Sequence, residues 1–157
     1  NDDIWKKMSK TNFRRNYHST SLLLPDGRIF VAGGDVWNAQ FFYPPYLFTK
    51  DNKGKTILAK RPEIKELKKT IINRKEQIML VDDSDDVEKI SLISTGSTTH
   101  AQASELKYLS LDFKKISKNK IKFSIPDNKN NVSDGTYLIF TVSGSGIPSE
   151  GKITYIK

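Results

Sequence analysis

Three side chains in this sequence could bind one metal ion together. Tyr17 and His18 are adjacent, and His100, the second of only two histidines, lies far along the chain. An imidazole nitrogen combined with a phenolic oxygen suits Cu(II), which accepts nitrogen and oxygen ligands in tetragonal geometry. Both histidines lie in hydroxyl-rich runs, so a structural, hydrogen-bonded role is the alternative. Because neighbouring side chains on a regular strand point to opposite faces, we expect Tyr17 and His18 to share an ion only where the backbone is irregular.

Other charged features point less clearly to chemistry. The sequence contains no cysteine, which excludes a disulfide framework and a zinc site built on thiolates. The acidic run 82–86 lacks the glycine and the final glutamate of an EF-hand, so we expect a solvated loop. The net charge of +8 comes from basic residues spread along the chain without interleaved aromatic pairs. This pattern favours a lysine-rich surface, and we expect no nucleic-acid partner.

The length sets the scale of the fold. The 157 residues suffice for one ordinary domain, or for a small domain and a piece of another. No apolar run approaches the roughly 18 residues of a membrane span, and we expect none. The chain begins Asn-Asp-Asp, with no initiator Met and no secretory signal. We therefore interpret the sequence as a mature form or a fragment.

The elements that must hold Tyr17 and His18 are short strands. Two apolar runs, 22–24 and 29–32, flank Pro25-Asp26-Gly27-Arg28, which predicts a tight turn between two strands of a hairpin. A further strand is expected over 39–43, before two prolines. Two or three strands cannot bury both faces of their sheet, so residues 1–45 do not make a domain. They are typical of one unit of a repeating propeller.

The remainder of the sequence predicts a β-sandwich. A polar stretch, 46–59, is expected to be a linker, and residues 60–157 to form an immunoglobulin-like domain. The Cys…Trp…Cys pattern of antibody domains is missing, so another subclass is expected. Lysines over 114–122 predict a charged hairpin at a sheet edge. The expected strands are short and separated by turn residues: 63–67, 77–81, 89–94, 106–113, 120–125, 136–143 and 152–156.

An ordered series of short motifs resembles one known family. The series runs through nearly the whole chain beyond residue 14, and it resembles the C-terminal part of the galactose oxidase and glyoxal oxidase group of copper-radical oxidases. Each motif alone is weak, but their common order is specific. The matching stretches are 15–20, 22–28 with Gly33-Gly34, 39–48, Arg61-Pro62, 90–93 with Gly96 and Thr99-His100, and 134–140 with 146–149.

The resemblance implies a fold and a site. Residues 1–45 would be the final, incomplete kelch-propeller segment, and 60–157 an early-set immunoglobulin-like sandwich. Tyr17 would be the axial tyrosine that takes the proton of the substrate alcohol, and His18 and His100 would be the copper imidazoles. A second tyrosine, cross-linked to a cysteine, carries the radical in the family. It would lie in an upstream propeller of the same polypeptide.

The implied activity is oxidation of a primary alcohol or aldehyde with O₂ reduced to H₂O₂. The expected substrate is a small alcohol, an aldehyde or a carbohydrate, and the expected location is extracellular or at the cell surface. Residues 103–107 depart from the Asn-Thr-Asp-Gln-Arg-like run of the family, and Ser94 and Thr95 stand where the family often has Arg and Tyr. The alternative is a non-catalytic kelch and early-set module that binds carbohydrate or protein.

Overall fold

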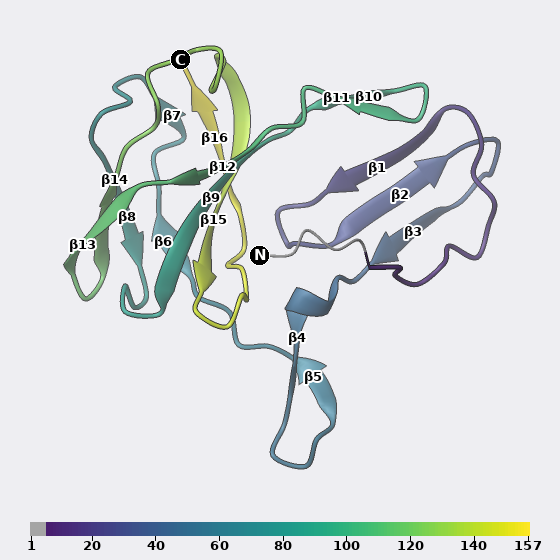
Figure 1. Ribbon diagram of the computed structural model, residues 1–157, viewed down its shortest axis with the longest axis horizontal. Helices are drawn as coiled ribbons and strands as arrows, with labels where there is room; N and C mark the ends of the chain where they lie inside the picture. Colours follow the sequence, from purple (N-terminus) through teal and green to yellow (C-terminus); the bar gives the residue numbers. More distant parts are fainter. Residues whose placement is uncertain (1–5) are drawn as a thin grey trace.

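The computed structural model describes residues 6–157, so the first five residues of the predicted segment 1–45 lie outside it. The fold is all-β: within the described part, the only helical element is the 3₁₀ turn η1 (Pro45–Leu47). No helix in that part is long and apolar enough to cross a membrane. A small N-terminal sheet, a projecting hairpin and a two-layered sandwich follow one another along the chain (Figure 1).

The N-terminal sheet has three antiparallel strands in the order β1 (Ser19–Leu23), β2 (Ile29–Gly33) and β3 (Ala39–Phe42). The expected hairpin is confirmed, since Leu22 pairs with Phe30 across the turn. Gly27 takes a φ of +83°, the left-handed conformation that the tight turn requires. The hydrogen bond from Arg28 holds the pKa of the Asp26 carboxyl below its ordinary value and closes the turn electrostatically.

The stretch predicted as a linker, 46–59, contains structure of its own. After η1 the chain forms a projecting antiparallel hairpin from β4 (Phe48–Lys50) and β5 (Thr56–Leu58). The backbone amide of Ala59 then bonds to the carbonyl of Leu47 at 2.9 Å. The chain therefore leaves the N-terminal sheet and returns to almost the same place before it enters the sandwich.

The sandwich consists of two sheets. The first has the strand order β12-β9-β15-β16-β7 and the second β13-β14-β8-β6. Neighbouring strands are antiparallel except β16 and β7, which are parallel. The strands are β6 (Ile64–Glu66), β7 (Thr70–Ile71), β8 (Gln77–Val81), β9 (Val87–Ser94), β12 (Tyr108–Leu111), β13 (Phe113–Ser117), β14 (Lys120–Phe123), β15 (Gly135–Ser143) and β16 (Lys152–Ile156).

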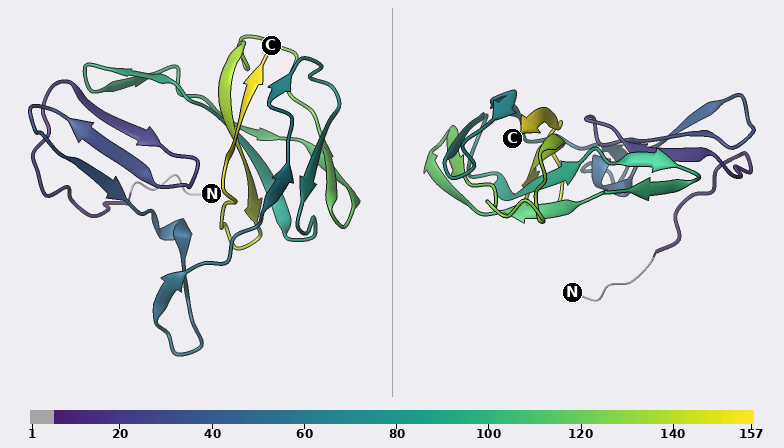
Figure 2. Two further views of the ribbon diagram at one scale, coloured as in Figure 1. Left: turned by 180° about the vertical axis from the view of Figure 1, so that it is seen from behind. Right: turned by 90° about the horizontal axis from the view of Figure 1, so that it is seen from above.

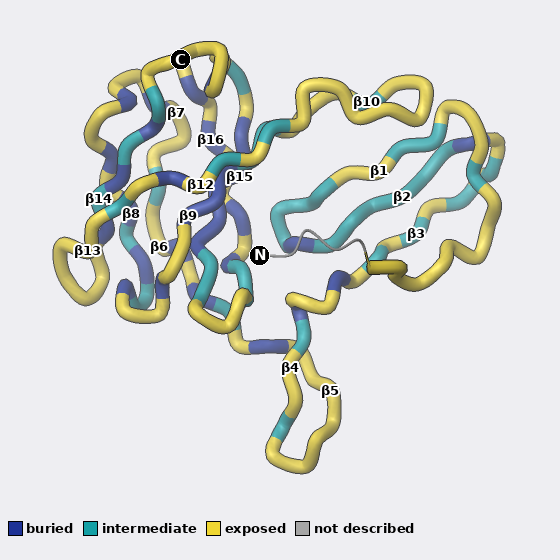
Figure 3. The backbone as a smooth tube through the Cα atoms, viewed as in Figure 1, coloured by how far each residue is buried: buried dark blue, intermediate teal, exposed yellow. Residues whose placement is uncertain are grey.

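The core lies between these two sheets, where buried residues concentrate (Figure 3). Successive side chains of a strand point to opposite faces of its sheet, so every second residue faces this core. In β14, for example, Ile121 and Phe123 are buried while Lys120 is exposed. In β15 the residues 137–141 are all buried. Tyr137 and Ile139 belong to the sandwich core, whereas Phe140 faces a cleft that the N-terminal part of the chain closes. The nearly continuous apolar run of β15 is thus explained by cover on both faces.

The predicted strand 106–113 divides in two at Asp112. β12 pairs with β9 in the first sheet, and β13 pairs with β14 in the second. The chain therefore crosses from one layer to the other within what the sequence pattern joins. The expected charged hairpin over 114–122 is confirmed, because β13 and β14 form an antiparallel pair and β13 is the edge strand of its sheet.

One hairpin extends out of the sandwich toward the N-terminal sheet. It joins β10 (Ser97–Thr99) to β11 (Gln102–Ser104) and is inserted between β9 and β12. It runs alongside β1, as the views in Figures 1 and 2 both show. We call this hairpin, residues 97–104, the arm.

Candidate metal centre

Tyr17 and His18 lie in a turn that leads directly into β1. The amide of Ser19 bonds to the carbonyl of Asn16 at 3.2 Å, and His18 has a φ of +64°. This left-handed residue breaks the alternation of a strand, so the two adjacent rings point to the same side. Their centroids are 4.2 Å apart. The irregular backbone that a shared ion would need is present here.

His100 reaches the same place from the sandwich. It occupies the tip of the arm, where Thr99 pairs with Gln102 and leaves a two-residue turn of His100 and Ala101. Its ring centroid lies 5.0 Å from that of Tyr17 and 5.2 Å from that of His18. The structure therefore brings together all three side chains that the sequence analysis selected.

The turn at the tip of the arm is strained. His100 and Ala101 have φ values of +54° and +63°, as a type I′ turn requires, but such turns favour Asn-Gly. A residue with a β-carbon in this conformation costs roughly 1–2 kcal/mol. Backbone strain of this kind persists where the surrounding structure imposes it, and it clusters at functional sites.

Glycines allow the Tyr17–His18 turn to pack against the end of β2. Gly33 and Gly34 both have a φ of +73°. A β-carbon on Gly33 would lie 2.5 Å from the carbonyl oxygen of His18, and one on Gly34 would lie 2.6 Å from the amide nitrogen of Asn16. The close approach that sets the position of His18 is therefore open only to glycine.

Arg15 fixes the other end of the same turn. Its guanidinium donates hydrogen bonds to the carbonyl of Gly33 at 2.8 Å and to the side-chain oxygen of Asn38 at 2.6 Å. These bonds tie the residues before Tyr17 to the loop between β2 and β3. Arg15 therefore acts on the position of the turn that carries Tyr17 and His18.

Arg61 connects the N-terminal sheet to the sandwich. Its guanidinium donates to the carbonyls of Pro148 at 2.8 Å and Asp26 at 2.7 Å, and also to that of Ser149. Burial lowers the pKa of Arg61, and the negative charge of Glu150 opposes that effect. One side chain thus holds the β1–β2 turn against the loop that follows β15.

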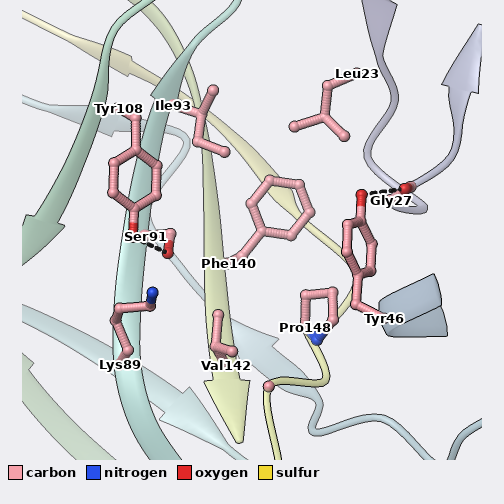
Figure 4. Close-up of a pocket in the computed structure, with 11 residues that line it drawn as sticks. Leu23, Gly27, Tyr46, Lys89, Ser91, Ile93, Tyr108, Phe140, Val142 and Pro148 are labelled. Atoms are coloured by element: carbon pink, nitrogen blue, oxygen red, sulfur yellow. Dashed lines mark hydrogen bonds between the residues drawn. The ribbon is translucent and has the colours of Figure 1, made fainter. Parts of the chain in front are cut away.

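Two further contacts support this junction and line a cleft. The Tyr46 hydroxyl donates to the carbonyl of Gly27 at 2.6 Å, and the amide of Gly151 donates to the carbonyl of Pro25 at 2.7 Å. A cleft of about 220 Å³ lies beside them. Figure 4 shows residues that line it, with the Phe140 ring between Ile93 and Tyr46. The β1–β2 turn is therefore seated on the sandwich, which fixes the separation between His18 and the arm.

The donor set fits a copper ion. A ring bound through nitrogen at about 2.0–2.1 Å has its centroid about 3 Å from the ion, so two rings around one ion have centroids roughly 4–6 Å apart. The centroids of the two imidazoles that could bind in this way, His18 and His100, are 5.2 Å apart and lie in this range. Among residues 6–157 no group of three or more His, Cys, Asp or Glu side chains could hold a metal. The candidate ligands at this place are the phenol of Tyr17 and the imidazoles of His18 and His100.

Sequence reasoning did not assign roles to Arg15 or Arg61, although both belong to the motifs that carry the family resemblance. Their partners are backbone carbonyls and, for Arg15, an amide side chain. Every residue has a backbone carbonyl, so the sequence does not indicate which carbonyl an arginine will bind. The only signal was position: Arg15 lies two residues before Tyr17, and Arg61 precedes the proline at the start of the sandwich.

Comparison with known proteins agrees with this architecture. Two galactose oxidases of Gibberella zeae are 30% identical over 155 residues, covering 94% of this chain and 22% of their own length. A WSC domain-containing protein of Arthroderma benhamiae is 26% identical over 151 residues, which are 87% of this chain and 15% of that protein. The chain thus spans between 15% and 22% of the curated relatives it matches.

A solved structure shares the fold. A fungal alcohol oxidase of the AA5 family, in complex with copper, superposes with a TM-score of 0.80 at 24% identity, covering 95% of this chain and 32% of that one. The galactose oxidase-like early-set domain family matches residues 61–156, which coincide with the two-layered sandwich. This confirms the family resemblance inferred from the ordered motifs. On the strength of that match, which covers more than half of its residues, the chain belongs to the galactose oxidase-like early-set family.

Proposed function

We propose that this chain is the C-terminal part of a copper-radical oxidase, and that Tyr17, His18 and His100 bind its copper ion. The observation that carries the proposal is the convergence of three rings from two distant segments to within 5.2 Å of one another. Family membership and a copper-containing structural relative support it. The chain covers a small part of its relatives, so the activity belongs to the longer polypeptide.

Each residue has a defined task in this proposal. His18 and His100 would hold the ion through ring nitrogens, and Tyr17 through its phenolic oxygen. When bound, copper would supply the one-electron redox chemistry. The primary alcohol loses two electrons and two protons, and O₂ takes them up to give H₂O₂. The Tyr17 oxygen would accept the hydroxyl proton of the alcohol as a general base. Because the sequence has no cysteine, the cross-linked radical tyrosine would come from the upstream propeller.

The N-terminal sheet supports the existence of that propeller. Leu22 and Phe41 on one face are 36% and 48% exposed, and Ile29 and Val31 line an open cleft on the other face. A three-stranded sheet with apolar side chains on both faces needs a neighbour on each side, as a propeller blade has. We therefore assign residues 1–45 to the last kelch segment and the missing neighbours to preceding blades.

Substrate and location follow from the same assignment. The proposed substrate is a small primary alcohol, an aldehyde or a carbohydrate, and the proposed location is extracellular or at the cell surface. The upstream propeller of the same polypeptide would be the partner of this chain. Propeller residues would line most of the substrate site, since the three candidate ligands here occupy one side of it.

The test uses the full-length polypeptide that carries this chain, loaded with Cu(II). We expect H₂O₂ from small primary alcohols or aldehydes, and loss of that production in the His18→Ala and His100→Ala variants. Upstream Tyr and Cys residues able to cross-link are expected as well. No copper uptake, or uptake unchanged in both variants, would reject the oxidase and favour the non-catalytic binding module.

Gly33 offers a test of the position of His18. We expect Gly33→Ala to weaken Cu(II) binding by the 157-residue chain at least about 10-fold, the lower end of the effect of disturbing a group that orients a ligand. The reason is the β-carbon, which would lie 2.5 Å from the His18 carbonyl oxygen and displace that residue. Competition with a chromogenic chelator measures the affinity.

Gly54 provides the matched control for Gly33. It has a φ of +78°, close to the +73° of Gly33, but a β-carbon there would meet nothing within 4 Å. Gly54→Ala therefore carries the same conformational penalty without the clash, and it should leave copper binding unchanged. Equal affinities in the two alanine variants would contradict the proposed role of the close approach.

A further inference from the structure

Thr99 contacts the one ring nitrogen of His100 that points back toward the arm. Its hydroxyl oxygen lies 2.7 Å from Nδ1 of His100. At this distance the two atoms share a hydrogen bond, whichever of them donates. The contact occupies Nδ1, so a metal ion can approach the ring only at Nε2.

Two placements of the proton are compatible with this contact, and only the one with hydrogen on Nδ1 leaves a lone pair on Nε2 for a metal ion. A neutral imidazole has one nitrogen that carries hydrogen and one that carries a lone pair, and a hydrogen bond to the first fixes which is which. Thr99 is exposed, so its own hydroxyl hydrogen can point to solvent while its oxygen accepts. In the arrangement that suits a metal ligand, Nδ1–H donates to the Thr99 oxygen and the lone pair lies on Nε2. Such partners orient metal-binding histidines and raise the basicity of the ring.

We propose that Thr99 is a positioning residue that fixes the orientation and tautomer of His100, so that His100 offers Nε2 to copper. This inference rests on the proposed function in naming the ion, but the tautomer is a property of the chain without metal. The turn at the tip of the arm restricts the backbone in a similar way. It holds His100 at a φ of +54°, while Thr99 holds the His100 ring. Both devices reduce the freedom that the ligand would lose on binding.

The first test reads the tautomer directly. Long-range ¹H–¹⁵N spectra of the metal-free 157-residue chain, at alkaline pH where imidazoles are neutral, distinguish the two nitrogens of His100. In the wild-type chain we expect the hydrogen on Nδ1. Thr99→Val keeps the branched shape but removes the hydroxyl, and it should abolish that preference. Thr99→Ser keeps the hydroxyl and should restore it.

The second test measures the affinity of the chain for Cu(II). We expect Thr99→Val to weaken Cu(II) binding about 10- to 100-fold, as for other partners that orient a metal ligand. Thr99→Ser should stay near the wild-type affinity. Thr98→Val is the matched control, since Thr98 precedes Thr99 in the same strand and its side chain lies toward the cleft beside β1. It should change neither the tautomer nor the affinity.

The outcomes separate the two proposals. The role of Thr99 would be overturned if Thr99→Val changed neither the His100 tautomer nor the Cu(II) affinity, provided that the NMR spectrum of the variant shows a folded arm. If the full-length polypeptide takes up no copper while the tautomer in the 157-residue chain still depends on Thr99, the copper function falls and the positioning role stands. If Thr98→Val lowers the Cu(II) affinity as much as Thr99→Val does, the effect is a general one of a β-branched apolar residue on the arm. That result would overturn the assignment to Thr99.

Discussion

Replacing His100 by Asn should weaken Cu(II) binding by the 157-residue chain more than about 100-fold, beyond the 10- to 100-fold typical of losing only an orienting partner. His100 supplies the only proposed ligand from the sandwich, so its loss removes the link between the two parts of the site. Asparagine tolerates a positive φ, so the turn at +54° is retained. Chelator competition measures the affinity, and the superhyperfine pattern of the electron paramagnetic resonance spectrum reports the loss of one nitrogen ligand.

Stability provides the control for this variant. His100 is exposed at the tip of the arm and lies outside the buried core cluster. The thermal unfolding midpoint of the metal-free chain should therefore stay at its wild-type value. The corresponding change His18→Asn should have an effect of the same size, because His18 also has a positive φ, at +64°. Copper affinity within about threefold of wild type in both variants, a difference below 1 kcal/mol, would contradict the ligand assignment.

Replacing Arg61 by Met should release the N-terminal sheet from the sandwich. The three carbonyls that the guanidinium bonds belong to Asp26 on one side and to Pro148 and Ser149 on the other. A hydrogen bond to a charged group contributes roughly 1.5–3 kcal/mol, so the loss of the bond to Asp26 alone is enough to weaken the junction substantially. We expect faster proteolysis within residues 6–45 and copper affinity reduced at least 10-fold, about 1.4 kcal/mol.

Two further variants sharpen the Arg61 test. Lys60 is exposed and directly precedes Arg61, so Lys60→Met controls for the loss of a positive charge and should be neutral. Arg61→Lys keeps the charge, but a compact ammonium lacks the planar fork that reaches three acceptors. We expect an intermediate loss. Proteolysis and affinity that are unaltered in Arg61→Met would show that other contacts, such as Tyr46 to Gly27, suffice to seat the turn.

The strands with regular apolar alternation could be predicted from the sequence. Pro25-Asp26-Gly27-Arg28 predicted the β1–β2 turn, because proline and glycine specify the backbone there directly. The core strand β14 followed from the alternation of apolar and polar residues over 121–125, and its burial alternates accordingly. Here local chemistry and tertiary packing favour the same structure.

The arm could not be predicted as a hairpin. Residues 97–104 are mostly small or polar, and the turn carries His100-Ala101 where the usual signal would be Asn-Gly. Its strands are imposed by tertiary contacts with β1. The division at Asp112 also escaped prediction, since Leu111 and Phe113 continue one apolar pattern while their strands join different sheets. Single residues that bond to carbonyls, such as Arg61, leave no periodic trace at all.

The crystal structure of the 157-residue chain with Cu(II), using anomalous scattering at the copper edge, tests the central claim most directly. We predict a single copper peak within about 2.0–2.2 Å of the Tyr17 oxygen, a ring nitrogen of His18 and Nε2 of His100, by analogy with other metal–nitrogen and metal–oxygen bonds. Copper bound elsewhere on the surface, or by only one of the three rings while the others point away, would contradict it.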